Sequence, residues 1–161
     1  MRCIEWAGVR LFESFVEMPR GWATNLLEEF FKHQGSVEKS HKIAGRWENQ
    51  YLTIDHAPSA RIPMRFARNM GKDGLDISSM ILFEAPSGSP NPHPPFWFNV
   101  AGKGEKTGLH DHAHGSILSA VTYLQAEENC GHLYFRKEGF EDLTIKPEVG
   151  KMLVFPSWLK H

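Results

Sequence analysis

Three histidines occupy alternate positions in the segment HDHAH, at His110, His112 and His114. In an extended strand, alternate side chains project from the same face and lie about 7 Å apart. Because neutral imidazole binds divalent transition metals, two of these rings could hold one ion together with a third ligand from a neighbouring strand. The downstream segment FPSWLKH, which ends in His161, could supply that ligand. A solvated, His-rich surface loop is the alternative interpretation of the cluster.

The composition is that of an ordinary globular protein. Of the 161 residues, 41% are hydrophobic and 23% are charged, and a chain of this size can bury a substantial core. Eighteen basic and nineteen acidic residues give a formal net charge of −1, with no basic block or stripe. The sequence therefore predicts neither a nucleic-acid partner nor binding to a membrane surface.

The cysteines and the N-terminal residues bear on the cellular compartment. Cys3 and Cys130 lie far apart and form no CxxC unit, so the sequence predicts neither a disulfide framework nor a zinc knuckle. The N-terminal segment has no signal-peptide pattern and no apolar stretch long enough to span a bilayer. We therefore expect a cytoplasmic protein.

Residues 20–33 predict an amphipathic helix. Large apolar side chains recur every four residues, at Trp22, Leu26 and Phe30, and Gly35 follows as a stop signal. A stripe of this kind indicates packing against a core and not chemistry. We expect this N-terminal helix to lie on the outside of the remaining structure.

Most of the other segments predict short strands, bounded by Gly, Pro or charged turn residues. Gly8 sits in the turn of a predicted N-terminal hairpin. The expected strands are residues 2–6, 9–13, 45–54, 74–85, 95–101, 117–125, 131–136, 142–146 and 151–155.

The connecting segments carry weaker signals. Residues 36–44 are polar and predict a loop, whereas residues 58–74 are compatible with an irregular connection or a short helix. The proline-rich residues 86–95 predict a rigid exposed loop. His41 and His56 have no metal-like spacing to other ligands, and we expect both to face solvent.

One helix followed by many short strands predicts an α+β chain that is mainly β, with a barrel or sandwich body. We expect residues 1–161 to form a single domain. Its N-terminal part, residues 1–92, would contribute the hairpin, the helix and supporting strands. Residues 93–161 would form the core that binds the metal.

Motifs in a fixed order extend over residues 97–161. This order resembles the double-stranded β-helix, a cupin-like jelly roll, of the iron(II)- and 2-oxoglutarate-dependent oxygenases. It is most similar to a branch found in marine bacteria and phages, with the pattern Trp-x-Asn, HxH, LSGVYY, GxLxF and PxxGxLxxFPSxLxH. The corresponding segments here are WFN (97–99), HDH (110–112), GSILSAVTY (115–123), GHLYF (131–135) and PEVGKMLVFPSWLKH (147–161).

The resemblance implies a facial set of three protein ligands, His110, His112 and His161, around Fe(II), with three positions left open. The cosubstrate 2-oxoglutarate would take two open positions and O2 the third, and Tyr123 would hydrogen-bond the cosubstrate. Oxidative decarboxylation to succinate would then drive hydroxylation of an unactivated C–H bond. A small molecule and a protein side chain are equally compatible as the primary substrate.

The chain also departs from the family pattern. Most members have a carboxylate as the second ligand, where this chain has His112, and Asp111 beside it should face away in a regular strand. Ala120 stands where the pattern has Gly. The spacing from HDH to GS is one residue longer than in the family, so His112 with His114 remains a competing pair.

In the family another strand follows the last histidine and carries an Arg that binds the 5-carboxylate of 2-oxoglutarate. We therefore expect this chain to be truncated after His161, with Arg136 or Lys151 as candidate replacements. A cupin-like metal-binding protein and an inactive binding module on the same barrel are the alternative functions. The cupin motif is a poor match, because its acidic ligand would fall at Ser116 or Ile117.

Overall fold

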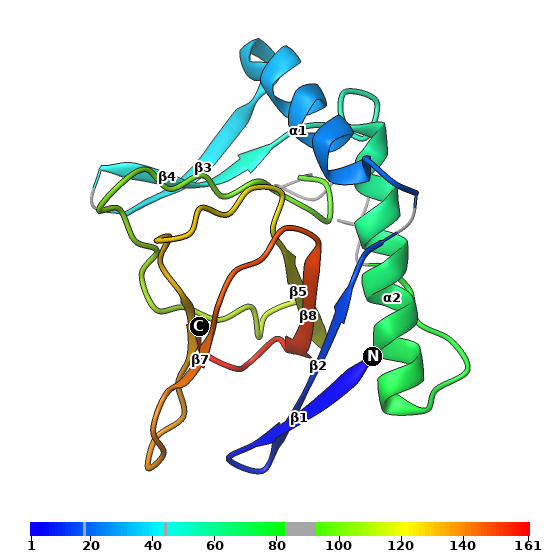
Figure 1. Cartoon of the computed structure of the whole chain (residues 1–161), viewed down its shortest axis with the longest axis vertical. Helices are drawn as coiled ribbons and strands as arrows, with labels where there is room; N and C mark the ends of the chain where they lie inside the picture. Colours follow the sequence, from blue (N-terminus) through cyan, green and yellow to red (C-terminus); the bar gives the residue numbers. More distant parts are fainter. Residues whose placement is uncertain (18, 44, 83–92) are drawn as a thin grey trace.

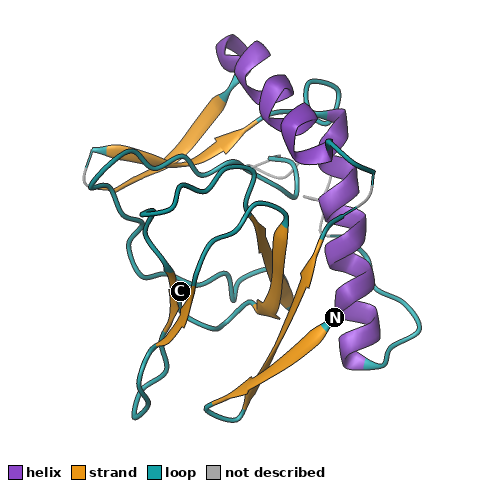
Figure 2. Cartoon of the chain, viewed as in Figure 1, coloured by secondary structure: helices purple, strands orange, loops and turns teal. Residues whose placement is uncertain are grey.

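The computed structural model describes residues 1–17, 19–43, 45–82 and 93–161. Within these residues the protein is mainly β, with two helices and antiparallel sheets, which confirms the α+β class (Figures 1 and 2). Short 3-10 turns lie at Gln34–Ser36 (η1) and Pro58–Ala60 (η2). In chain order the helices and strands are β1 (Arg2–Trp6), β2 (Val9–Phe15), α1 (Trp22–Lys32), β3 (Glu38–Ile43), β4 (Arg46–Tyr51), α2 (Arg61–Leu75), β5 (Leu118–Thr122), β6 (Leu133–Phe135), β7 (Leu143–Ile145) and β8 (Lys151–Pro156).

The central element is a four-stranded antiparallel sheet with the order β1-β2-β8-β5. Val154 of β8 pairs with Phe12 of β2 on one side and with Ala120 of β5 on the other. Every residue of β8 from Lys151 to Phe155 is buried. A strand buried on both faces has a continuous apolar run instead of alternating polarity, and the sequence MLVF has this pattern.

One face of the sheet carries Phe12, Met152 and Val154 and packs against both helices. α2 crosses this face closely, and a Cβ added at Gly74 would come within 2.6 Å of the Phe12 ring. Gly71 makes a similar approach to Leu118 of β5. Figure 1 shows α2 running beside the sheet, with α1 above it. The two glycines therefore set how closely the helix approaches the sheet.

The opposite face packs against the two-stranded sheet β6-β7. Leu11, Leu153 and Phe155 project there from the central sheet, in strict alternation with the residues of the first face. They meet Phe135 of β6 and Ile145 of β7, both buried. The arrangement places the C-terminal residues between β8 and β6.

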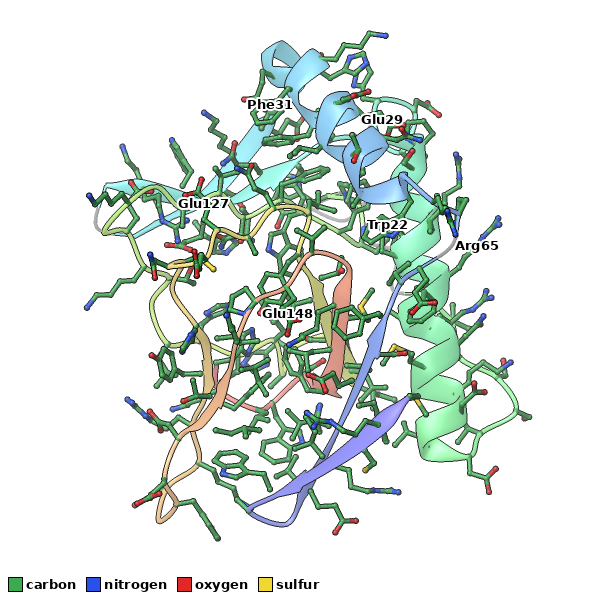
Figure 3. All side chains as sticks on the ribbon, viewed as in Figure 1. Trp22, Glu29, Phe31, Arg65, Glu127 and Glu148 are labelled. Carbon is green, nitrogen blue, oxygen red and sulfur yellow. The ribbon has the colours of Figure 1, made fainter. Side chains whose placement is uncertain are left out.

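The predicted apolar stripe of α1 is confirmed, because Trp22, Leu26 and Phe30 are all buried in the first core cluster. Glu29 fixes the same helix to the start of α2. Its carboxylate accepts hydrogen bonds from the backbone N–H of Ser59 at 3.0 Å and from the Ser59 hydroxyl at 2.7 Å. In Figure 3, Glu29 extends from α1 towards α2.

The N-terminal hairpin and the strands within residues 117–156 lie where the sequence predicted them, although several are shorter than expected. The loop prediction for residues 36–44 is wrong for residues 38–43, because β3 pairs with β4 there, and residue 44 lies outside the described residues. β3 is an exposed strand rich in charged residues, so it lacks the apolar signal of a core strand. The predicted strand at 95–101 is reduced to one bridge, between Phe98 and Gln50.

The interval between residues 58 and 85 also differs from the prediction. α2 has fifteen residues, longer than the short helix considered, and Pro63 is tolerated because it lies in its first turn. The strand predicted at 74–85 is wrong for residues 74–82. The helix runs to Leu75, and Asp76 then takes a left-handed conformation with φ of 53°. Residues 83–85 of that prediction, and residues 86–92 of the predicted loop, lie outside the described residues.

His41 is exposed, as predicted, but His56 is not fully solvent-facing. The His56 ring is half-buried and stacks on His33, with ring centroids 4.5 Å apart. Neither helix in the described part of the chain is long and apolar enough to cross a membrane.

Candidate metal centre

The structure brings together His110, His112 and His161, the three residues predicted as ligands. One nitrogen from each ring lies within 4.8 Å of the others, a separation that one metal ion could bridge. Their ring centroids are 4.5 to 5.2 Å apart. Within the part of the chain that the structure describes, no other group of three or more His, Cys, Asp or Glu residues converges in this way.

The competing histidine lies outside the cluster. His114 is exposed, and it does not share the region where the other three rings converge. Asp111 is also exposed, and its carboxylate accepts a hydrogen bond from the backbone N–H of Ala113 at 3.2 Å. The geometry therefore favours His110 with His112 over His112 with His114 as the pair of ligands. The carboxylate of Asp111 is bonded within its own turn.

Backbone pairing explains why residues so distant in sequence meet. The N–H of His110 donates to the carbonyl of His161 at 3.1 Å, and the N–H of His161 donates back to the carbonyl of His110 at 3.0 Å. The N–H of His112 donates to the carbonyl of Ser157 at 2.7 Å. On its other side the terminal segment pairs with Arg136, whose N–H donates to the carbonyl of Lys160 at 2.9 Å. The terminal segment that carries His161 is therefore bonded to the segment of His110 and His112 on one side and to Arg136 on the other. These backbone hydrogen bonds hold the three histidines in place.

Ser157 anchors the start of this terminal segment. Its side chain is buried, and its hydroxyl lies 2.7 Å from that of Ser116 and 3.0 Å from that of Ser119. Its backbone N–H also donates to the carbonyl of Ile117 at 3.0 Å. These contacts fix the turn that follows β8. They therefore position the segment in which His161 pairs with His110.

Two of the three rings are oriented by backbone carbonyls. The Nδ1 of His110 lies 2.8 Å from the carbonyl oxygen of Gly108, and the Nδ1 of His161 lies 2.9 Å from that of Leu159. Because a carbonyl oxygen can only accept, each Nδ1 carries a proton when the ring is neutral. This leaves each Nε2 with a free lone pair, which is the form that coordinates a metal.

Electrostatics keep two of the rings neutral. Burial, together with the positive charges that His110 and His161 would carry, lowers the pKa of His112 to about 4. The pKa of His161 is also lowered, chiefly by burial, although its hydrogen bond to the Leu159 carbonyl opposes the shift. Neutral imidazole is the ligand form, so these two side chains need not lose a proton to bind a metal at neutral pH.

Aromatic side chains surround the rings. Trp97 lies against His112, with ring centroids 5.1 Å apart, and Phe155 lies 4.8 Å from His161. Phe135 adds a third contact at 6.0 Å from His161. An apolar surround of this kind limits solvent access and strengthens interactions with any charge bound there.

Tyr123, the predicted cosubstrate ligand, follows β5. Its hydroxyl is buried and has no hydrogen-bond partner among the residues that the structure describes. Burial raises the pKa of this phenol above its ordinary value, so the hydroxyl stays protonated and can donate. The backbone carbonyl of Tyr123 accepts from the N–H of Gly150 at 2.9 Å, which fixes the residue beside the start of β8.

The two candidate replacements for the carboxylate-binding Arg are already engaged. Arg136 donates two hydrogen bonds to Asp142, at 2.9 and 2.5 Å, and lies on the surface. Lys151 contacts the carboxylate of Glu148 and donates to the carbonyl of Lys146 at 2.9 Å. Neither cation is free to bind a cosubstrate carboxylate in this conformation.

Sequence reasoning missed a polar network around Arg46 of β4. Its guanidinium donates to Glu48 at 2.7 Å, to Asn99 at 2.9 Å and to Thr107 at 2.6 Å. Both members of the Arg46–Glu48 pair are nearly buried, with side chains 9% and 5% exposed. The network ties the β3-β4 hairpin to the segment that leads into His110. No sequence spacing indicates this network, because the Arg46–Glu48 pair becomes buried only when the chain folds.

Comparison of the chain with protein-family models, with curated proteins and with solved structures gave no match. Functional assignment therefore depends on the residues of the site and on the chemistry that they permit.

Proposed function

We propose that this chain is a non-haem Fe(II)- and 2-oxoglutarate-dependent dioxygenase on a double-stranded β-helix, with a small molecule or a protein side chain as its substrate. The convergence of His110, His112 and His161 is the observation that carries the proposal. The three nitrogens suit a divalent first-row metal, and three ligands on one side leave positions open for other molecules. Fe(II) bound there with 2-oxoglutarate would supply the O2 chemistry that hydroxylates a C–H bond.

The side chains of this protein would each have a defined task. His110 and His161 would bind the metal through Nε2, since their Nδ1 atoms are bonded to carbonyls. Phe155 and Trp97 would keep bulk water from the rings that they contact. The buried hydroxyl of Tyr123 would donate a hydrogen bond to the cosubstrate.

An all-imidazole ligand set has an electrostatic consequence. Three neutral histidines leave the full double charge of Fe(II) uncompensated, whereas a carboxylate ligand would cancel part of it. A metal held by three histidines would therefore attract the dianion 2-oxoglutarate more strongly than one held by two histidines and a carboxylate. This effect would partly offset the absence of a free cation at Arg136 and Lys151.

The same donor set supports a second candidate, a metal-binding barrel that does not use 2-oxoglutarate. Three histidines also form catalytic zinc sites, and Zn(II) binds nitrogen ligands more tightly than Fe(II) does. The engagement of Arg136 and Lys151 favours this candidate, which includes a cupin-like protein and an inactive binding module.

For either candidate we propose a cytoplasmic, single-domain protein. Cys3 and Cys130 are both free thiols in the structure, as a reducing compartment requires. Fe(II) is likewise maintained under reducing conditions.

Two measurements separate the candidates. Anaerobic titration with Fe(II) and 2-oxoglutarate should give the visible charge-transfer band of a chelate, and exposure to O2 should then release succinate. His161→Ala should abolish both signals. Tight binding of metal without a band and without succinate would contradict the dioxygenase and leave the second candidate.

A further inference from the structure

One guanidinium on β4 bonds both ends of the segment that precedes the histidine cluster. Arg46 donates to the carbonyl of Val100 at 2.7 Å and to the hydroxyl of Thr107 at 2.6 Å. Residues 101–107 are all exposed and include no helix or strand. A segment of this kind has little packing of its own, so the bonds at its ends matter most for its position. Arg46 supplies one such bond at each end.

The end of this segment leads directly to a candidate metal ligand. Gly108 follows Thr107 in the chain, and its carbonyl oxygen lies 2.8 Å from the Nδ1 of His110. That hydrogen bond selects the ring form with the proton on Nδ1 and the free lone pair on Nε2. A displacement of Thr107 would also move the carbonyl of Gly108, because the two residues are adjacent. The orientation of His110 therefore depends on where Thr107 is held.

The burial of Arg46 with Glu48 also favours a positioning role. Their side chains are 9% and 5% exposed, and the attraction between two buried charges often only offsets the cost of their desolvation. Such a pair is therefore weak evidence for a role in stability. Glu48, at 2.7 Å, and the side chain of Asn99, at 2.9 Å, hold the guanidinium in one orientation. A planar fork of fixed N–H groups specifies the positions of its partners.

We infer that Arg46 is a positioning residue of the candidate metal centre. Through Thr107 and the carbonyl of Gly108, it holds the ring of His110 in the tautomer that coordinates a metal. The inference deepens the proposed function and rests on its metal centre, although it requires neither 2-oxoglutarate nor O2. It predicts that a change at Thr107 alters both the tautomer of His110 and the affinity for metal.

Replacement of Thr107 tests this role, because its exposed side chain can be changed with little effect on the core. Thr107→Val keeps the shape and removes the acceptor, whereas Thr107→Ser keeps the hydroxyl. NMR of the histidine ring nitrogens distinguishes the two neutral tautomers in the metal-free, full chain at about pH 8. His110 should carry its proton on Nδ1 in the wild type and in Thr107→Ser. In Thr107→Val, a fraction of the His110 rings should carry it on Nε2, and an unchanged tautomer would overturn the inference.

His161 provides an internal control for a general loosening of the site. Its Nδ1 is bonded to the carbonyl of Leu159 at 2.9 Å, in the terminal segment and not in the one that Arg46 bonds. The tautomer of His161 should therefore stay the same in Thr107→Val. Equal changes at His110 and His161 would indicate a loosened fold and contradict the positioning role. Thr144→Val, the same change at an exposed position of β7, should alter neither ring.

The affinity for Zn(II), measured by competition with a chelator, provides the second readout. Loss of the direct partner of a metal ligand typically weakens binding about 10- to 100-fold. Thr107 lies one step further from the metal, so Thr107→Val should weaken Zn(II) binding by the equivalent of one hydrogen bond, about 2- to 12-fold. Thr107→Ser should bind as the wild type does. Equal affinities of the valine and serine variants would overturn the inference.

A double variant tests whether the effect originates at Arg46. Arg46→Met alone would leave the buried carboxylate of Glu48 without its cation, so it is combined with Glu48→Met. The double variant should shift the tautomer of His110 in the same direction as Thr107→Val and weaken Zn(II) binding at least as much. If Thr107→Val acts and the folded double variant does not, Thr107 works without Arg46 and the inference is wrong. If the double variant does not fold, the comparison of the two Thr107 variants decides.

The two readouts separate failure of this inference from failure of the proposed function. If the wild type binds Zn(II) but neither the tautomer nor the affinity responds to Thr107→Val, Arg46 is not a positioning residue and the metal centre stands. If the tautomer responds but the wild type binds no Zn(II), the proposed function fails together with the role of Arg46 in metal binding. In that case only the connection from Arg46 to His110 stands.

Discussion

His110 and His161 exchange two backbone hydrogen bonds, with N···O distances of 3.1 and 3.0 Å, while their side chains converge on one point. The backbone pairing and the candidate metal centre are therefore the same structural feature. Pairing of the two segments brings the rings within reach of one ion, and an ion bound there would in turn stabilise the pairing. This coupling predicts that metal binding and folding are linked.

The first prediction concerns the register of the histidines. His112→Ala should weaken Ni(II) binding more than about 100-fold, because losing a ligand costs more than losing a partner outside the coordination sphere. His114→Ala should leave the affinity unchanged, since that side chain is exposed and outside the cluster. Competition with a chelator measures both affinities. A larger effect from His114 would show that the HAH pair binds the metal.

Metal binding should also raise the melting temperature. Metal at a concentration of 100 times Kd stabilises the folded state by about 2.7 kcal/mol. For a chain of this length, that corresponds to an increase of about 5–10 °C. Differential scanning fluorimetry with Ni(II) measures the shift, and EDTA should reverse it. If neither Ni(II) nor EDTA changes the melting temperature, metal binding does not stabilise the pairing of the two segments.

The third prediction is the pH dependence of the metal-free protein. Burial lowers the pKa of His112 from 6.5 to about 4, so between these pH values the unfolded chain binds more protons than the folded one. The free energy of unfolding should therefore fall as the pH decreases from about 6.5 to about 4. His112→Ala should make this decrease shallower. Urea titrations at several pH values compare the two proteins, and identical slopes would contradict the proposed cause.

A fourth prediction tests the contact between α2 and the sheet. Gly74→Ala would place a methyl group within 2.6 Å of the Phe12 ring and should destabilise the protein by about 1–3 kcal/mol, despite the better helix propensity of alanine. Gly35→Ala is the control, because a Cβ there meets nothing within 4 Å. Urea unfolding measures both variants. If Gly74→Ala is as stable as the wild type, α2 can move away from the sheet at little cost.

The last prediction separates two roles of Tyr123. Tyr123→Phe removes a buried hydroxyl that has no partner among the described residues, so the free energy of unfolding should stay the same or rise. Binding of 2-oxoglutarate to the Fe(II) form should weaken about 2- to 12-fold, since one hydrogen bond contributes about 0.5–1.5 kcal/mol. A variant with reduced stability and unchanged cosubstrate affinity would indicate that the hydroxyl is structural.

Much of the local structure could be predicted from the sequence, because short-range patterns encode it. The four-residue spacing of Trp22, Leu26 and Phe30 indicated α1, and the apolar run MLVF indicated β8. The convergence of His110, His112 and His161 was also predictable, because the order of motifs linked HDH to the terminal histidine. In contrast, β3 was missed because most of its residues are polar or charged. The length of α2 was underestimated because arginines interrupt its apolar positions.

The tertiary structure alone decided which distant residues meet. No local pattern indicates that Arg46 and Glu48 form a nearly buried pair, or that the Trp97 ring lies near both His112 and Tyr51. Burial and these ring contacts depend on where the β3-β4 hairpin lies relative to the loop before His110. That placement results from packing across the whole chain, whereas the periodicity of a helix or strand is set by its own backbone geometry.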